Sequence, residues 1–318
     1  MKKLLVVLMA IGLLVGCSVK DEDKLTIGII NWADHPALND AKEGFILGLK
    51  ELGIDKQINI IDKNAFDESS NADMIISQMV ADQVDLIYAI ATPAAQAAVN
   101  ATMDSDIPII FNAVTDPVLA GLVANPNQPE GRVTGISDIV PINKQLALIK
   151  EFLPEVVNVG VIFNTGEDNS WSQIQEIEAV IEDIDLKLIK KGITLSSEIA
   201  LTTEQIIHDA DVLYIITDNM VAKATPQVVS IANTKKVPVF MAEAGQFEHG
   251  ILASDSISYL NLGKQAANMA KAILIDQKAI AEIPVEISLD TELFVSQAVA
   301  DFLNIEIPES ILARAILK

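Results

Sequence analysis

The sequence is poor in several residue types that particular functions require. Its single cysteine excludes a disulfide within one chain. It has 22 lysine and arginine residues against 44 aspartate and glutamate residues, and the net charge of −22 repels phosphate backbones. This charge argues against a nucleic-acid-binding protein. Aromatic residues make up only 4% of the chain, and both tryptophans, Trp32 and Trp171, follow apolar runs that are typical of strands.

Histidine is also scarce, and the sequence motifs of common enzymes are absent. The three histidines, His35, His208 and His249, have neither a metal-binding nor a catalytic-triad spacing. No phosphate-binding loop, dinucleotide-binding glycine motif or nucleophile elbow occurs in the sequence. His35, which precedes Pro36, is expected to order a loop rather than to act as a general base. We therefore expect no enzyme, no cofactor and no metal site.

The N-terminus has the form of a lipoprotein export signal. Lys2 and Lys3 precede an apolar run that is too short to span a bilayer. The cysteine, Cys17, ends the sequence LLVGC, which resembles the bacterial lipobox, whose cysteine carries the lipid anchor. We expect residues 1–16 to be a signal peptide and 17–24 a tether. The protein would then be extracytoplasmic and anchored to a membrane by its lipid.

After residue 24, short apolar runs alternate with amphipathic stretches. Continuous runs such as LTIGII (25–30) are typical of parallel strands buried on both faces. The alternation predicts an α/β fold with parallel, doubly wound, Rossmann-like sheets, and it is interrupted at 124–138 and again at 242–250. These interruptions suggest two lobes with a cleft between them. Helices are predicted over 38–52, 71–82, 93–103, 143–152, 170–184, 203–209, 224–234 and 258–276.

Ligands of open α/β sheets bind beyond the carboxyl ends of the strands, so the loops at those ends are the candidate site. Thr92 begins a predicted helix, and the free amide groups of its first turn suit a carboxylate. Thr92 could equally serve only as the cap of that helix. Asn169 or Ser170 begins a second helix, with Trp171 just inside it.

Three acids on other loops of this kind could bind an ammonium group. They are Asp116, Asp218 and Glu243. Asp116 could simply cap a turn, whereas Asp218 and Glu243 are harder to explain as caps. If the helix start bound the carboxylate of an amino acid and one of these acids bound its ammonium group, the ligand would be held at both ends. The two tryptophans, Trp32 and Trp171, could wall a flat ligand or could pack beneath their own loops.

Several segments, in unbroken order, resemble the substrate-binding lipoproteins of ABC transporters, in the branch typified by members that bind tryptophan and other aromatic amino acids. The resemblance covers nearly all of the mature chain and implies a type I periplasmic-binding fold, in which three crossing strands join two lobes and the ligand closes between them. The segments are HPALNDAKEGFILGLKELG (35–53), DLIYAIATPAAQAA (85–98), NAVTDPVLAGLV (112–123), GRVTGISD (131–138), GVIFNTGEDNS (160–170) and LGKQAANMAKAIL (262–274).

The resemblance also sets the expected lobe boundaries. The crossings are expected near 136–140, 245–250 and 286–290. Lobe 1 would comprise residues 25–137 and 250–285, and lobe 2 residues 138–249 and 286–318.

By position in the family, Thr92 with its helix start would bind the ligand carboxylate, and Asp116, Asp218 or Glu243 would hold the amine. The sequence WAD (32–34) departs from the family pattern, which leaves the side chain of the ligand open. The full predicted site is Trp32, Asp34, Thr92, Asp116, Asn169, Ser170, Trp171, Asp218, Asn219 and Glu243.

The function implied by the resemblance is capture of an amino acid by hinge closure, with tryptophan or another aromatic amino acid preferred, and its delivery to a membrane permease coupled to an ATPase. The protein is expected to act as a monomer. Two alternatives stay open. One is a receptor of the same fold that reports to a signalling partner, and the other is an exported enzyme that uses cleft carboxylates.

Overall fold

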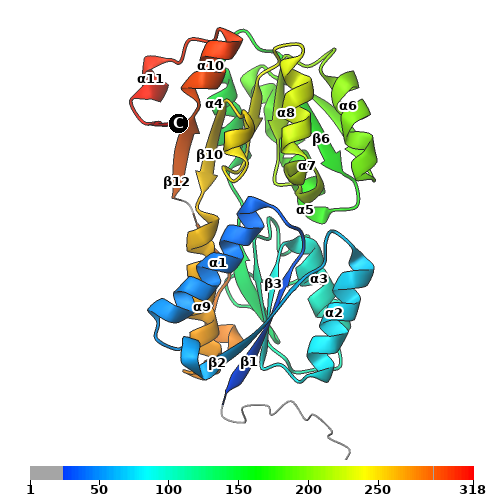
Figure 1. Cartoon of the computed structure of the whole chain (residues 1–318), viewed down its shortest axis with the longest axis vertical. Coiled ribbons are helices and arrows are strands. Elements are labelled where there is room, and N and C mark those ends of the chain that lie inside the picture. Colours follow the sequence, from blue (N-terminus) through cyan, green and yellow to red (C-terminus); the bar gives the residue numbers. More distant parts are fainter. Residues whose placement is uncertain (1–23, 289) are drawn as a thin grey trace, which may run out of the picture.

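The computed structural model describes residues 24–288 and 290–318. The predicted signal peptide and Cys17 lie outside the described residues. Two α/β lobes are stacked along the long axis of the molecule, as predicted (Figure 1). Within the described ranges, no helix has both the length and the apolar character needed to cross a membrane.

The first lobe contains a parallel sheet with six strands among the described residues, in the order β11-β5-β4-β3-β1-β2. Its strands are β1 (Leu25–Asn31), β2 (Ile58–Asn64), β3 (Leu86–Ile90), β4 (Ile109–Asn112), β5 (Val133–Ser137) and β11 (Glu286–Ile287). Its helices are α1 (Pro36–Glu51), α2 (Ser69–Ala81), α3 (Thr92–Ala101) and α9 (Tyr259–Leu274).

The second lobe contains a sheet with seven strands in the described part of the chain, in the order β13-β12-β10-β9-β8-β6-β7. Its strands are β6 (Asn158–Asn164), β7 (Lys187–Ile193), β8 (Val212–Ile215), β9 (Val239–Met241), β10 (Ala253–Ile257), β12 (Thr291–Val295) and β13 (Ile316–Leu317). Its helices are α4 (Ile142–Phe152), α5 (Asp168–Val180), α6 (Ile199–Ile206), α7 (Asn219–Lys223), α8 (Thr225–Asn233), α10 (Gln297–Leu303) and α11 (Glu309–Leu312). The pairing of β10 with β12 is antiparallel. Short 3₁₀ turns occupy Asp55–Gln57, Ile181–Ile184, Ser196–Glu198, Phe247–His249 and Ile280–Glu282.

Apolar side chains fill both faces of each sheet, which is why the strands read as continuous apolar runs. In β1, Ile27, Ile29 and Ile30 are fully buried. In the second lobe, α4 and α5 share one apolar cluster with the sheet, and α6 and α8 share another. The helices therefore cover both faces of the second sheet.

The chain crosses between the two sheets between β5 and α4, between β10 and α9, and between β11 and β12. The predicted boundary at 250 is wrong, because β10 pairs with β9 and β12 in the second sheet. This crossing lies between Ile257 and Tyr259 instead. The boundary at 286 is also displaced, because β11 pairs with β5 in the first sheet.

The helices of the second lobe differ from the prediction in two places. The helix predicted over 203–209 is α6, which begins at Ile199 and ends at Ile206. The short helix α7 was not predicted. It begins there because the Oδ1 atom of Asp218 accepts a hydrogen bond from the amide of Val221, at 2.9 Å.

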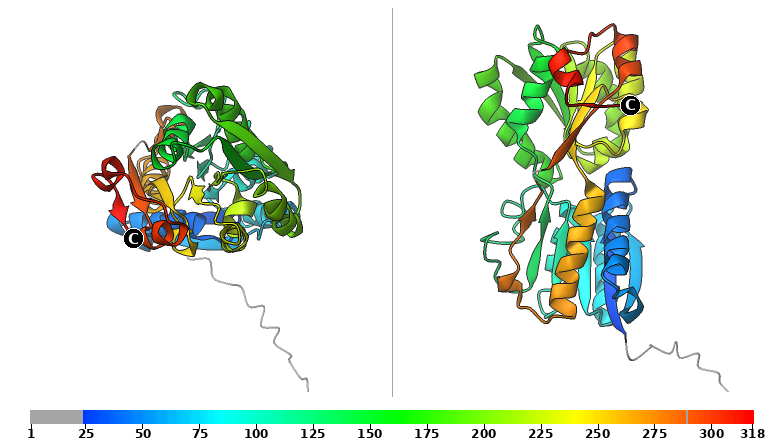
Figure 2. Two further views of the ribbon diagram at one scale, coloured as in Figure 1. Left: turned by 90° about the horizontal axis from the view of Figure 1, so that it is seen from above. Right: turned by 90° about the vertical axis from the view of Figure 1, so that its left-hand side faces the viewer.

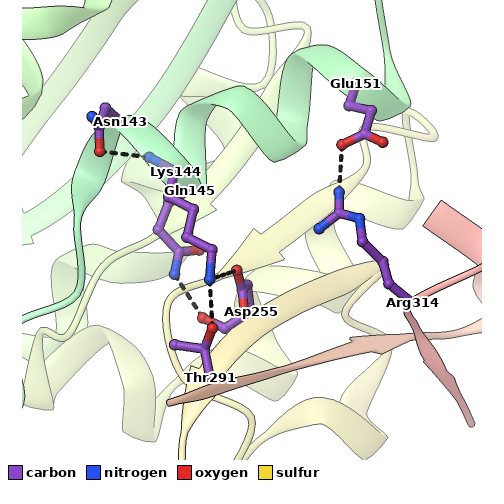
Figure 3. A network of polar contacts seen from close by, with 7 residues as sticks. All are labelled: Asn143, Lys144, Gln145, Glu151, Asp255, Thr291 and Arg314. Carbon is purple, nitrogen blue, oxygen red and sulfur yellow. Dashed lines mark hydrogen bonds and ion pairs between the residues drawn. The ribbon is translucent and has the colours of Figure 1, made fainter. Parts of the chain in front are cut away.

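The crossings are braced on the side of the second lobe by Lys144 of α4 (Figure 3). Its Nζ atom lies 2.8 Å from Oδ2 of Asp255 in β10, and it donates to Oγ1 of Thr291 in β12 at 2.5 Å. The Nε2 atom of Gln145 donates to the carbonyl oxygen of Asp255 at 2.6 Å. These contacts join the three segments at the points where they enter the second lobe. We therefore expect the lobe to move as one body.

Helices α1 and α9 pack side by side in the first lobe, although they lie far apart in the sequence (Figure 2). Glycines permit this close approach. A Cβ atom added at Gly44 of α1 would overlap the carbonyl oxygen of Leu260, and one added at Gly263 of α9 would overlap that of Ala41. Since both overlaps involve backbone atoms, a larger side chain would force the helices apart.

Replacing Gly44 with alanine should lower the free energy of unfolding by about 1–3 kcal/mol, because the added methyl overpacks this interface. Urea denaturation of the variant would measure the loss. Glu43→Ala, on the exposed side of the same helix, is the control and should change stability by less than about 0.5 kcal/mol. Equal stability of the two variants would contradict the prediction.

Candidate ligand-binding site

A closed cavity lies between the two lobes, at the carboxyl ends of the strands, where α/β sheets bind ligands. Its volume is about 20 Å³, slightly more than the roughly 10–15 Å³ that one water molecule needs on this measure. The cavity is lined by His35, Ala37, Leu38, Ala113, Thr115, Asp138, Asn169, Thr217, Asp218, Asn219, Ala222, Glu243 and Tyr259.

Direct contacts between the lobes close this cavity. In its wall, the Oγ1 atoms of Thr115 and Thr217 lie 3.2 Å apart, and Nε2 of His35 lies 3.3 Å from Oδ1 of Asn219. At the rim, Lys223 of α7 pairs with Asp67 of the first lobe, with 2.6 Å between Nζ and Oδ2. The lobes are therefore in a closed arrangement.

Four acids are buried at this interface: Asp138, Glu167, Asp218 and Glu243. No lysine or arginine in the described ranges is buried with them. Burial raises the pKa of all four, and raises that of Glu243 to about 7. The pKa of Glu167 is also about 7, because burial acts together with the nearby charge of Asp218. The site thus buries four carboxyl groups without a cation, and a ligand cation would favour their ionised forms.

Glu243 is the acid whose hydrogen bonding is least complete. Its Oε2 atom accepts from the amide of Gly245, whereas its Oε1 atom has no partner among the described residues. After burial, the neighbouring carboxylates of Asp40 and Asp138 contribute to its raised pKa. One oxygen of Glu243 is therefore available to a donor in the cavity.

His35 and Asn169 supply two further acceptors without partners. Asn219 uses its Nδ2 atom to donate to Glu167 at 2.5 Å, so its Oδ1 atom faces His35, and Nε2 of His35 must carry the hydrogen. The pKa of His35 is lowered, chiefly by burial, and the neutral ring keeps Nδ1 as an acceptor. Neither Nδ1 of His35 nor Oδ1 of Asn169 has a partner in the described part of the chain.

The structure brings four of the ten predicted site residues to the cavity wall, namely Asn169, Asp218, Asn219 and Glu243. Ser170 stands behind them and donates to Oδ2 of Asp218 at 2.7 Å. Asp218 caps α7 as well, contrary to the expectation that it is hard to explain as a cap.

The other predicted residues do not line the cavity. Trp32 is buried in the core of the first lobe, and Asp34 is exposed. Thr92 is buried at the start of α3, and its hydroxyl has no partner among the described residues. Asp116 accepts from the amides of residues 118 and 119, as a turn cap does. Trp171 packs outward against Phe163, with 4.9 Å between the ring centres.

Three residues of the site, Asp138, Glu167 and Tyr259, are not among those predicted from the sequence. Asp138 directly follows β5, so its place at the end of a strand was a usable signal. Glu167 precedes α5 in the segment GEDNS, from which only Asn169 and Ser170 are predicted to contact the ligand. The hydroxyl of Tyr259 donates to Oδ2 of Asp138 at 2.8 Å across a separation of 121 residues, and the sequence carries no signal for that contact.

Known proteins of similar sequence share this architecture. A family model described as ABC transporter substrate-binding protein matches residues 26–317. A tyrosine-binding protein of Clostridioides difficile strain R20291 is 39% identical over 315 residues, which cover 93% of this chain and 90% of that protein.

Two solved structures indicate the state of the lobes. An ABC domain from Streptococcus pneumoniae in complex with L-Trp is 34% identical and has a TM-score of 0.89, with 92% of this chain and 99% of that chain covered. The ligand-free, open structure of a substrate-binding protein with adhesive properties from Clostridium difficile is 38% identical at the same coverage, but its TM-score is 0.70. The two relatives are about equally similar in sequence, but the open structure superposes less well on this one than the complex with L-Trp does. This difference agrees with a closed arrangement of the lobes here. The chain belongs to the ABC transporter substrate-binding proteins, a family that binds solutes and is not enzymatic.

Proposed function

We propose that this protein binds an aromatic amino acid between its lobes and delivers it to the permease of an ABC importer. The observation that carries the proposal is the set of three buried acceptors without partners, on His35, Asn169 and Glu243, in one cavity. A primary ammonium group has three N–H donors and a positive charge. It would satisfy all three acceptors and offset the excess of buried carboxylates.

The carboxylate of the ligand would bind at the start of α3. Thr92 begins this helix with a buried hydroxyl that lacks a partner among the described residues, and a helix start favours an anion. Asp116 is a poor candidate for the amine, because its carboxylate already accepts two backbone amides. Glu243 is the acid that we assign to this role.

The relatives support the choice of an aromatic ligand. One is named a tyrosine-binding protein, and another was solved in complex with L-Trp. Because the closed cavity is much smaller than such a ligand, binding would hold the lobes slightly further apart than in this structure. The open form would capture the ligand, and contacts from both lobes would favour closure.

The remaining steps follow from this role. The loaded, closed protein would dock on a membrane permease, and an associated ATPase would supply the energy for import. Proteins of this kind work outside the cytoplasm, and we assign the anchor to a lipid on Cys17. A monomer suffices for this cycle, because both halves of the site come from one chain.

Isothermal titration calorimetry of the purified protein with tyrosine, tryptophan and phenylalanine tests the proposal. We expect saturable 1:1 binding of at least one of them. N-acetyl derivatives of the same amino acids lack the ammonium group and should bind at least about 30-fold more weakly, because they leave buried charge unpaired. Absence of binding by all three amino acids, or equal binding of the acetylated forms, would contradict it.

Affinity should also depend on pH. In the closed, unliganded site burial raises the pKa of Glu243 to about 7, whereas a bound ammonium would favour the ionised carboxylate and lower that pKa. The unliganded protein then binds more protons than the complex, so affinity is highest above pH 7 and falls as the pH drops below 7, by up to about tenfold per pH unit for one proton. Calorimetry from pH 5.5 to 8.5 would measure this slope, and constant affinity over the range would contradict it.

A further inference from the structure

A second, smaller cavity lies directly beside the first. Its volume is about 10 Å³, and it shares Thr115, Asp138 and Thr217 with the first cavity as a common wall. Val140, Ile142 and Ala242 contribute apolar surface to it. The remaining lining residues are Gln173, Glu176 and Tyr214.

Tyr214 of β8 carries the polar group in this cavity that has no partner. Its side chain is 1% exposed, and its hydroxyl makes no hydrogen bond to any described residue. Gln173, by contrast, donates to the carbonyl oxygen of Asn169 and accepts from the amide of Thr217. Asp138 accepts from two hydroxyl groups.

The phenol of Tyr214 keeps its proton. Burial raises its pKa above the ordinary value, and the carboxylates of Glu176 and Asp255 raise it further. A buried O–H donor without an acceptor costs free energy, so a ligand group that accepts this proton gains affinity by binding there.

The wall between the two cavities is itself a contact between the lobes. Thr115 follows β4 of the first lobe, Thr217 follows β8 of the second, and their Oγ1 atoms lie 3.2 Å apart. A ligand that holds the lobes slightly apart would separate these hydroxyls. The two cavities would then join into one elongated site, with Glu243 and Tyr214 on different parts of its wall.

We propose that Tyr214 is a specificity-determining residue that selects a ligand with a phenol group, so that tyrosine is preferred over phenylalanine and tryptophan. This inference rests on the proposed function. The aromatic ring would extend between Thr115 and Thr217, and its hydroxyl would accept the proton of Tyr214. The side chain of phenylalanine has no polar group, and the indole N–H of tryptophan can only donate a hydrogen bond. Either ligand would therefore leave the hydroxyl proton of Tyr214 unpaired.

The test compares tyrosine with phenylalanine and tryptophan by calorimetry, in the wild-type protein and in Tyr214→Phe. We expect the wild type to bind tyrosine about 10- to 100-fold more tightly than the other two. Tyr214→Phe should lose that preference through weaker binding of tyrosine, while its affinity for phenylalanine changes less than about twofold. The variant removes a hydroxyl that makes no hydrogen bond to the described residues, so it should fold.

Tyr88→Phe is the matched control. Tyr88 is also fully buried, but in the first lobe, where its hydroxyl donates to the carbonyl oxygen of Ala41 and accepts from Asn112. This variant should be less stable than the wild type, but its preference for tyrosine over phenylalanine and tryptophan should be unchanged. A wild type without preference for tyrosine, or a Tyr214→Phe variant that keeps the preference, would overturn the assignment of Tyr214 alone. A wild type that binds none of the three amino acids would overturn the proposed function as well.

Discussion

Replacement of Glu243 by glutamine should weaken the binding of the aromatic amino acid at least about 30-fold. The substitution keeps the size of the side chain, and its amide oxygen can still accept from the amide of Gly245. It removes the charge that faces the proposed ammonium, in a place where that charge is almost fully buried. Loss of one partner of a buried charged pair costs about 2–5 kcal/mol, which is a factor of about 30 or more in affinity.

The same substitution should leave the unliganded protein at least as stable as the wild type. Glu243 is repelled by Asp40 and Asp138 in the closed form, and glutamine removes this repulsion. The predicted pH dependence of affinity should become weaker too. Lost affinity with unchanged or increased thermal stability would therefore separate a role in binding from a role in folding.

Glu248→Gln is the matched control for this experiment, because Glu248 is exposed and lies five residues further along the same segment. It removes the same charge from the protein as a whole, so any effect of net charge would appear in both variants. Calorimetry would measure both affinities. If the two variants bind alike, the ammonium group is not held by Glu243.

Replacement of Trp32 by alanine should lower the free energy of unfolding by about 3–5 kcal/mol, because it leaves a cavity in the core of the first lobe. The side chain of Trp32 is 6% exposed and belongs to the apolar cluster of that lobe. Its backbone is hydrogen-bonded to Ile90 of β3 and to Asp67 in the loop after β2. The structure thus favours the packing role over the ligand wall, the two alternatives left open by the sequence.

The other tryptophan provides a comparison within the same chain. Trp171 is 37% exposed and packs on the outside of the second lobe, so Trp171→Ala should cost only about 1 kcal/mol. Urea denaturation would measure both losses, and calorimetry would show whether affinity changes. A Trp32→Ala variant that keeps its stability but loses tenfold or more in affinity would restore Trp32 as a wall of the ligand site.

The sequence predicted much of the fold because the relevant signals are local. A continuous apolar run indicates a strand that is buried on both faces, and an amphipathic pattern indicates a helix that is buried on one. Each pattern can be recognised within the segment itself. The assignment of strands to a lobe was predicted less well, because it depends on which strands pair with one another. Strand β10 belongs to the second sheet only because β9 and β12 flank it, and nothing within residues 253–257 records those neighbours.

The candidate site was predictable to a smaller extent. Some residues in the loops after strands were found, since the end of a strand can be located from its own sequence. Asp218 and Glu243, in the loops after β8 and β9, are examples. The role of each residue depends on the tertiary structure. Asp218 caps α7, whereas Glu243 keeps one oxygen without a partner among the described residues.

The sequence by itself determined the two-lobed α/β architecture, the family and the loops that carry the site, because these follow from local periodicity and from ordered motifs. Only the tertiary structure decided which side chains of those loops meet. The contacts of His35 with Asn219, of Thr115 with Thr217 and of Tyr259 with Asp138 join residues more than 100 positions apart. The first two of these contacts exist only once the lobes close on each other, and closure also buries the acids and the unpaired acceptors from which the ligand is inferred.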